Sequence, residues 1–201
     1  MIFVFDLDDT VCDTDGYSEK YILNYFKEYN LPYKQIAKET RFAETKFDWN
    51  KDIALEWYKA HGDKMMGELP CKKNAIKTIN ELYEMGHTIV IATARATDWH
   101  TDPEGVTRKW LLDNNIKHHK AYIGRVDKEE ICKEEKADVF IDDDIKITQR
   151  VSEYFSSCNK KGKCYLMSTA YNKNLDAANG VVRVKDFDDF KEKINKIELD
   201  E

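Results

Sequence analysis

Six short apolar runs alternate along the chain with longer helical or polar segments, and this alternation limits the fold more than any other feature. The runs cover residues 2–5, 88–94, 121–123, 139–141, 164–167 and 181–184. Runs this short and this uniformly apolar are typical of strands that are covered on both faces. Strands that alternate with helices predict an α/β fold, in which one parallel sheet is sandwiched by helices.

The segment between the first two runs is too long for a simple connection. From about residue 14 to residue 69 no strand pattern occurs, and apolar residues recur at helical spacing. These residues are Tyr21, Ile22, Tyr25, Phe26, Tyr29, Ile53, Leu55, Trp57 and Tyr58. We therefore expect a small helical cap over 14–69, inserted after the first strand, and a core built from 1–13 and 70–201.

Three helix boundaries carry recognisable end signals. Gly86 is expected to end the helix that precedes the second strand, because glycine adopts the left-handed conformation of a C-terminal cap. Asp102 and Pro103 are predicted to be the N-cap and first residue of another helix. Asp127 and Glu130 have the spacing of a capping box, which predicts a helix that begins at the next residue after Asp127.

Length and charge exclude some classes of function. A chain of 201 residues is long enough for one substantial core. A net charge of −6 and a pI near 5.5 disfavour a protein that binds long nucleic acid. Nucleic-acid ends stay possible as a partner. The five cysteines are odd in number and form no C-x-x-C pair, which is typical of a reducing compartment. No run of 18 apolar residues occurs, so we expect a cytoplasmic protein without a membrane partner.

The sequence IFVFDLDDT places two carboxylates, Asp6 and Asp8, two residues apart where the first strand ends. The hydroxyl of Thr10 follows two residues later. Carboxylates this close repel one another unless a cation lies between them, and hard oxygen ligands suit Mg²⁺. One of them could also attack phosphorus, and the other could donate and accept protons.

Polar residues also close two later apolar runs. Thr93 and Arg95 lie at the end of the second, and Asp142, Asp143 and Asp144 follow the fourth. In parallel α/β sheets ligands bind outside the carboxyl ends of the strands. We therefore expect these side chains to meet the first pair of carboxylates at one edge of the sheet.

Four segments resemble the motifs of the haloacid dehalogenase-like superfamily of Mg²⁺-dependent phosphatases. They are DLDDT, IATAR, FIDDD and Lys128 in GRVDKEE. The resemblance covers the chain apart from the insertion and implies a Rossmann-like core with a helical cap. It implies that Asp6 is the nucleophile and Asp8 the general acid and base, and the presence of Asp8 favours hydrolysis of a phosphate monoester through an aspartyl-phosphate intermediate.

The resemblance also implies the remaining site residues. Thr93 and Lys128 would bind the transferring phosphoryl group. Mg²⁺ would be held by Asp142 and Asp6 with the backbone carbonyl of Asp8. Asp143 is expected to support Lys128 or the metal. Apart from the resemblance, the positions of Thr10, Ala94 and Arg95 at strand ends and of Trp49 in the insertion make these four the expected substrate contacts.

The substrate is expected to be a small phosphorylated molecule selected by the aromatic-rich cap. Most cap aromatics would fill the cap's own core, and FDWN at 47–50 is the best candidate for a pocket wall. The pair Tyr171 and Asn172 resembles the 5'(3')-deoxyribonucleotidase branch, although Ala170 stands where proline is usual. A nucleoside monophosphate, and so a 5'-nucleotidase, is the favoured prediction.

Three alternatives stay open. The segment ATARATDWHTDPEGVTRKWL resembles the phosphatase module of polynucleotide kinase 3'-phosphatases, which act on nucleic-acid ends. A phosphatase of another small metabolite, such as a sugar phosphate, is the second alternative. A non-catalytic binding module is the third, but its signature would be a lost Asp6, Asp8 or Asp142, and all three are present.

Overall fold

A computed structural model of the protein describes residues 1–97, 99–124, 127–158 and 162–198. Its centre is one sheet of six parallel strands in the order β3-β2-β1-β4-β5-β6. The strands are β1 (Ile2–Phe5), β2 (Thr88–Thr93), β3 (Lys120–Ile123), β4 (Val139–Asp142), β5 (Lys163–Met167) and β6 (Val181–Val184). All six predicted strands are confirmed, each to within one residue at either end.

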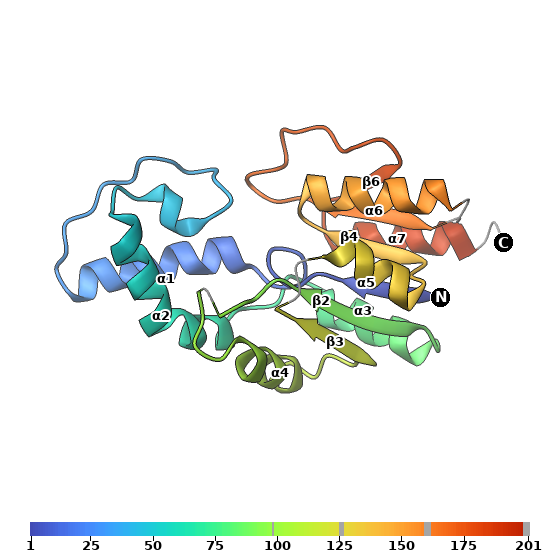
Figure 1. The fold of residues 1–201 in the computed structure, drawn as a ribbon, viewed down its shortest axis with the longest axis horizontal. Coiled ribbons are helices and arrows are strands. Elements are labelled where there is room, and N and C mark those ends of the chain that lie inside the picture. The colour runs from blue at the N-terminus through green and yellow to red at the C-terminus, as the bar shows by residue number, and fades with distance from the viewer. Residues whose placement is uncertain (98, 125–126, 159–161, 199–201) are drawn as a thin grey trace.

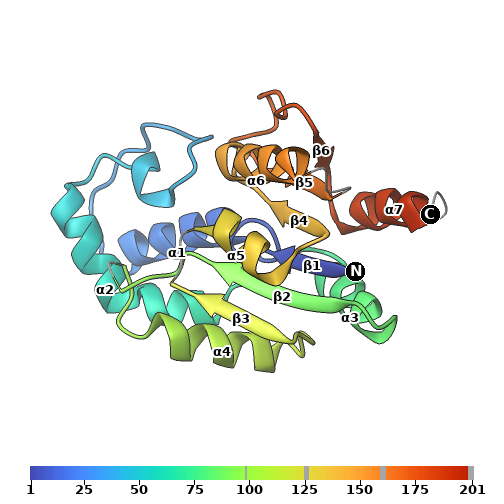
Figure 2. The ribbon, with the colours of Figure 1, turned by 45° about the vertical axis from the view of Figure 1, so that its right-hand side comes forward.

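Helices cover both faces of the sheet, as Figures 1 and 2 show. One face packs against α3 (Ala75–Glu84), α4 (Pro103–Asp113) and α7 (Phe187–Glu198), and the other against α5 (Lys128–Glu135) and α6 (Ile145–Ser157). Strand β1 contributes to the hydrophobic core on each face of the sheet. Phe3 and Phe5 lie in the core beside α3, α4 and α7, and Val4 lies in the core beside α5 and α6. The predicted α/β sandwich is confirmed.

Between β1 and α3 the chain forms α1 (Thr14–Glu28), the short 3₁₀ helix η1 (Ala43–Lys46) and α2 (Lys51–Gly67). These elements lie beyond the edge of the sheet in Figure 1, and α2 packs against α4. The rings of Phe26, Phe47, Trp49 and Trp57 contact one another, with centroids 5.4 to 6.4 Å apart. Cap aromatics thus pack mainly against each other, while the limits 14–69 stay a prediction.

The helix end signals have the structures that the sequence predicts. Gly86 has φ +84° directly after the last turn of α3, where a side chain would be strained. The carboxylate of Asp102 accepts the amide of Gly105 at 2.9 Å and caps α4. Asp127 accepts the amide of Glu130 at 3.1 Å and caps α5.

The register of the central strands determines where the site lies. Phe5 of β1 pairs with Ile91 of β2 and with Ile141 of β4. The residues that follow these positions therefore leave the sheet at the same edge, and the amide of Asp6 donates to the carbonyl of Ile141 at 3.1 Å. All five cysteines are free thiols, and no described helix is long and apolar enough to cross a bilayer.

Candidate active site

Three buried carboxylates meet at the carboxyl ends of β1 and β4. Asp6, Asp142 and Asp143 are each at most 3 % exposed, and one oxygen of each lies within 4.8 Å of the others. Lys128 joins two of them, because its ammonium donates to Asp6 Oδ1 at 2.5 Å and to Asp142 Oδ2 at 2.6 Å. The structure therefore brings together four of the residues that the sequence singles out.

The first residue of α5 places the ammonium. Lys128 begins this helix directly after the Asp127 cap, and its side chain is only 4 % exposed. Neighbouring carboxylates outweigh its burial and raise the pKa of Lys128, so the amine stays charged. A fixed ammonium at this position can bind an anion that approaches Asp6.

Among the described residues, the three buried carboxylates outnumber the two cations that pair with them, Lys128 and Arg41. Burial raises the pKa of Asp6 well above its usual range despite Lys128, and Asp142 and Asp143 raise it further. Burial and Asp142 likewise raise the pKa of Asp143 to about 7. Asp6 Oδ2 is buried without a hydrogen-bond partner among the described residues. An unpaired buried oxygen and a surplus of negative charge fit a site for a cation with oxygen ligands.

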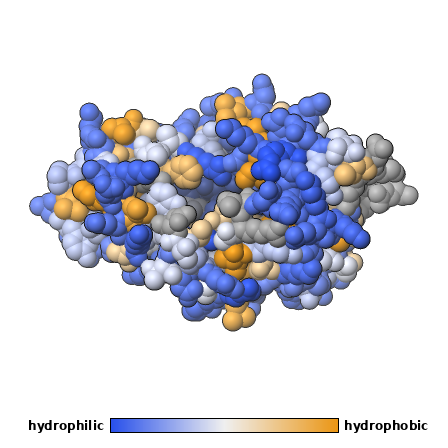
Figure 3. Space-filling model, in the orientation of Figure 1, coloured by the Kyte–Doolittle hydropathy of each residue, from blue (hydrophilic) through white to orange (hydrophobic). Residues whose placement is uncertain are grey.

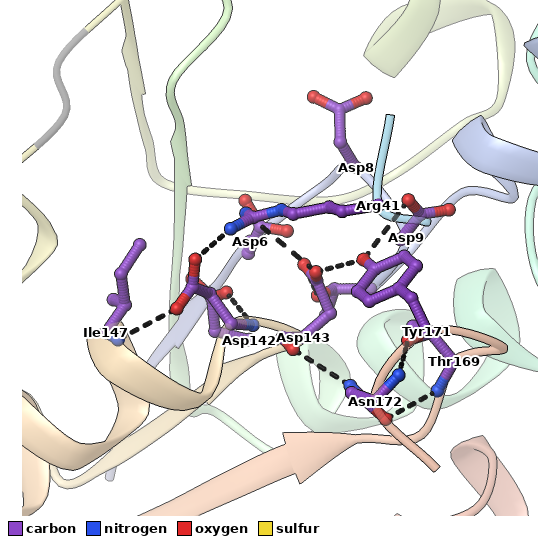
Figure 4. A network of polar contacts seen from close by, with 12 residues as sticks. Asp6, Asp8, Asp9, Arg41, Asp142, Asp143, Ile147, Thr169, Tyr171 and Asn172 are labelled. Carbon is purple, nitrogen blue, oxygen red and sulfur yellow. Dashed lines mark hydrogen bonds and ion pairs between the residues drawn. The ribbon is translucent and has the colours of Figure 1, made fainter. Parts of the chain in front are cut away.

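The Asp8 carboxylate points away from this group, as Figure 4 shows. It forms an ion pair with Arg95, with Nη2 at 2.9 Å and Nε at 3.0 Å, and accepts the hydroxyl of Thr14 at 2.8 Å. Burial alone would raise the pKa of Asp8, but Arg95 outweighs it and lowers the pKa to about 2. Thr93, predicted to bind the phosphoryl group, donates to Asp8 Oδ2 at 3.3 Å.

Arg95 is buried beside Asp8. Its guanidinium donates to the hydroxyl of Thr107 at 3.3 Å and lies 5.7 Å from the ring centroid of Trp110. Both partners lie on α4, so this helix fixes the arginine and the arginine holds Asp8. The sequence predicts Arg95 as a substrate contact, whereas its contacts here are to the protein.

The other predicted substrate contacts occupy different positions. Thr10 is buried and donates to Asp143 Oδ1 at 3.3 Å. Ala94 is exposed directly after β2. Trp49 is half-buried in the ring cluster of the cap. The surface is hollowed between the cap and the side of α6, and hydrophilic side chains border the hollow (Figure 3).

Several site residues have no role in the sequence prediction. The hydroxyl of Tyr171 donates to Asp143 and lies 3.3 Å from Asp9, and the amide of Asn172 donates to the carbonyl of Asp143 at 2.9 Å. From the sequence, the Tyr171–Asn172 pair carries only a resemblance, and no contact with the site is predicted for it. Asp9 has φ +59°, and burial raises its pKa to about 7.

Arg41 is a further residue that the sequence prediction misses. It comes from the cap segment between α1 and η1 and forms an ion pair with Asp144, with Asp143 4.0 Å away. No periodic pattern surrounds Arg41 in the sequence, so only the fold reveals its position.

Comparison with known proteins gives one curated relative and many solved structures of similar fold. The putative nucleotidase BH1399 of Halalkalibacterium halodurans is 25% identical over 192 residues, which cover 90% of this chain and 86% of that protein. No family model matches the chain.

The solved structures match along nearly the whole chain. A haloacid dehalogenase-like hydrolase of Streptococcus pneumoniae is 15% identical, with a TM-score of 0.62 and 96% and 97% of the two chains covered. A hydrolase of the same superfamily from Deinococcus radiodurans, solved with bound phosphate and sodium, is 12% identical, with a TM-score of 0.62 and 98% and 96% covered. The chain therefore has the haloacid dehalogenase-like fold, as the resemblance of its four motifs implies.

Proposed function

We propose that this protein is a Mg²⁺-dependent phosphomonoesterase that acts through an aspartyl-phosphate on Asp6. The observation that carries the proposal is the buried contact of Lys128 with both Asp6 and Asp142 at the ends of adjacent strands. A nucleophilic carboxylate, an ammonium for the phosphoryl oxygens and a second carboxylate for a cation are the parts that phosphoryl transfer needs.

In the first step an Asp6 oxygen attacks phosphorus. The bond between phosphorus and the leaving oxygen breaks, and Asp8 supplies a proton to that oxygen. In the second step Asp8 takes a proton from water, which attacks the aspartyl-phosphate and restores the Asp6 carboxylate. Lys128 and Thr93 bind phosphoryl oxygens, and Lys128 balances the negative charge that these oxygens carry.

Asp6 and Asp142 would hold Mg²⁺, with the backbone carbonyl of Asp8 as a third ligand and Asp143 as a neighbour. The unpaired Asp6 Oδ2 and the surplus of buried carboxylates support this assignment. Bound there, the ion would neutralise charge on the phosphoryl group.

We propose a nucleoside monophosphate as the substrate class, and so a 5'-nucleotidase. The curated relative that matches along 90% of this chain is named a nucleotidase, which supports this choice. The aromatic side chains of the cap supply flat surfaces of the kind on which bases stack. The exposed side of half-buried Trp49 is our candidate for such a surface.

The test is phosphate release with Mg²⁺ from a panel of substrates, with Asp6→Asn as the blank. The panel contains deoxynucleoside and ribonucleoside monophosphates, sugar phosphates and a 3'-phosphorylated oligonucleotide. Preference for the monophosphates is the expected result. Preference for the oligonucleotide would assign the protein to repair of nucleic-acid ends, and preference for a sugar phosphate would move the substrate class. Release from none of them, or release by Asp6→Asn, would contradict the proposal.

A further inference from the structure

One cation of the cap reaches the carboxylates of the core. Arg41 belongs to the segment between α1 and η1, and its guanidinium pairs with Asp144 and lies 4.0 Å from Asp143 (Figure 4). Its side chain is 43% exposed, so an incoming ligand can reach it. The ring of Phe42 lies 5.6 Å from the guanidinium and supports it from one side.

Asp144, the ion-pair partner of Arg41, caps α6 without help from the arginine. Asp144 is the N-cap of α6, and its Oδ1 accepts the amides of Lys146 at 2.8 Å and Ile147 at 3.2 Å. These two bonds satisfy the helix end without the arginine. The guanidinium can therefore exchange Asp144 for another anion while α6 keeps its cap.

The segment that carries Arg41 is held firmly at its base. Lys46 is only 2 % exposed and pairs with Asp15 and Glu19 of α1, both at 2.7 Å. The amide of Ile36 donates to the carbonyl of Lys46 at 2.8 Å, which closes the segment 36–46 into a loop. Its base is therefore a fixed support for the residues between.

Among the side chains that the structure describes, those that join the tip of the loop to the core by ion pairs, Arg41 and Glu39, are themselves exposed. Besides the Arg41 pair, Glu39 forms an ion pair with Lys173 at 2.6 Å, and both side chains are about half exposed. Exposed ion pairs contribute little to stability. The loop 36–46 can therefore shift over the carboxylates without loss of its base.

We propose that Arg41 binds the phosphate group of the substrate from the cap side and so couples phosphate binding to the position of the loop 36–46. This inference rests on the proposed function and adds a substrate-binding residue to it. A planar guanidinium binds two phosphate oxygens at once, which a lysine does not. With Mg²⁺ held beside Asp143, Arg41 would be attracted less strongly to that carboxylate, and a phosphate oxygen would give the guanidinium a new partner.

The test compares Arg41→Gln with Lys173→Gln. Arg41→Gln removes the pairs with Asp143 and Asp144, and Lys173→Gln removes the pair with Glu39 of the same loop. Of the two cations, only Arg41 reaches the carboxylates of the site. Calorimetric titration with inorganic phosphate in the presence of Mg²⁺ is the first measurement. We expect Arg41→Gln to bind phosphate about tenfold more weakly, the effect of losing a hydrogen bond to a charged group, and Lys173→Gln to bind it as the wild type does.

Titration with Mg²⁺ alone is the second measurement. Here Arg41→Gln should change the affinity in the opposite direction. Loss of the positive charge near Asp143 should strengthen Mg²⁺ binding about threefold in Arg41→Gln. A damaged site would weaken both ligands, so opposite shifts identify the electrostatic role. Unchanged phosphate affinity in Arg41→Gln, or equal weakening in both variants, would overturn the inference.

The two proposals fail in different ways. If the wild type hydrolyses phosphate esters and Arg41→Gln binds phosphate normally, only the role of Arg41 is wrong. If phosphate binding depends on Arg41 but the wild type hydrolyses nothing, the role of Arg41 stands and the phosphatase proposal is wrong. Failure of the wild type to bind phosphate at all contradicts both.

Discussion

Asp8 is the residue whose position decides how the proposed reaction proceeds. Paired with Arg95, its carboxylate is ionised, with a pKa lowered to about 2 by the guanidinium against the opposing effect of burial. An ionised Asp8 suits the second step, in which it takes a proton from water. For the first step the carboxyl must carry a proton, so it has to separate from Arg95 when the substrate binds.

Substitution of Arg95 tests this coupling. In Arg95→Met the partly buried Asp8 carboxylate loses its counterion, so its pKa rises and its position is no longer fixed. We expect kcat to fall about 100-fold, the lower end of what a positioned acid or base contributes, and the acidic limb of the pH–rate profile to move to higher pH. Arg95→Lys is the matched control for charge without the planar fork. A wild-type pH–rate profile in Arg95→Met would show that Arg95 does not position Asp8.

His100 gives a prediction of stability against pH. The ring is 9 % exposed, and burial and Arg95 lower its pKa, against the opposing charges of Asp8 and Asp63, which lies 3.5 Å away. A histidine with a lowered folded pKa contributes full stability above its unfolded pKa of about 6.5 and loses it as the pH falls below that value. Thermal unfolding between pH 7.5 and 5 should therefore lose less stability in His100→Gln than in the wild type. Equal slopes would contradict the buried neutral state.

The sequence predicted the carboxylates of the site but not their partners. Asp6 and Asp142 close apolar strands, and such positions converge by topology alone. The pairing of Asp8 with Arg95 depends instead on α4, which fixes the guanidinium through Thr107 and Trp110. Contacts of this kind arise from packing between distant segments, and no local pattern records them.

At the scale of elements, α5 connects stability to the site, because its first residue is Lys128. Asp127→Ala removes the cap at this end and should destabilise the protein by about 1 kcal/mol. Asp186→Ala removes the bond that Asp186 accepts from the amide of Asp189 at the start of α7, and it should cost about the same. Only Asp127→Ala should also lower kcat, since only this cap positions an ammonium that contacts Asp6. Urea unfolding and kcat measurements on both variants test this prediction. Equal kcat values would show that the N-cap of α5 does not affect the site.

The strands were predictable because each is buried on both faces and therefore apolar throughout. The loop 36–46 was not, because it contains neither a strand nor a helical repeat long enough to detect, and its order comes from the buried pair of Lys46 with α1. The helices of the cap were predictable from their aromatic spacing. The role of their aromatic side chains was not predictable, because the same spacing occurs both in a packed cluster and in the wall of a pocket.

At the scale of the whole molecule, the fold places one region of unbalanced charge at the edge of its sheet. Asp6, Asp142 and Asp143 are buried together, and in the part of the chain that the structure describes the cations paired with them are Lys128 and the half-exposed Arg41. Buried like charges oppose folding unless they are compensated. The folded state alone assembles these ligands, so a divalent cation that binds them should stabilise the whole domain.

Addition of Mg²⁺ should therefore raise the melting temperature. At a concentration about 100 times the dissociation constant the gain is about 2.7 kcal/mol, which corresponds to a rise of about 5 to 10 °C for a chain of this size. Asp142→Asn should lose most of this rise, because it removes a proposed ligand. Asp113→Asn, at the exposed end of α4, should keep it. Scanning calorimetry with EDTA and then with excess Mg²⁺ measures both effects. An equal rise in all three proteins would show that the ion acts elsewhere, because a site built on the carboxyl ends of β1 and β4 cannot bind it equally well without Asp142.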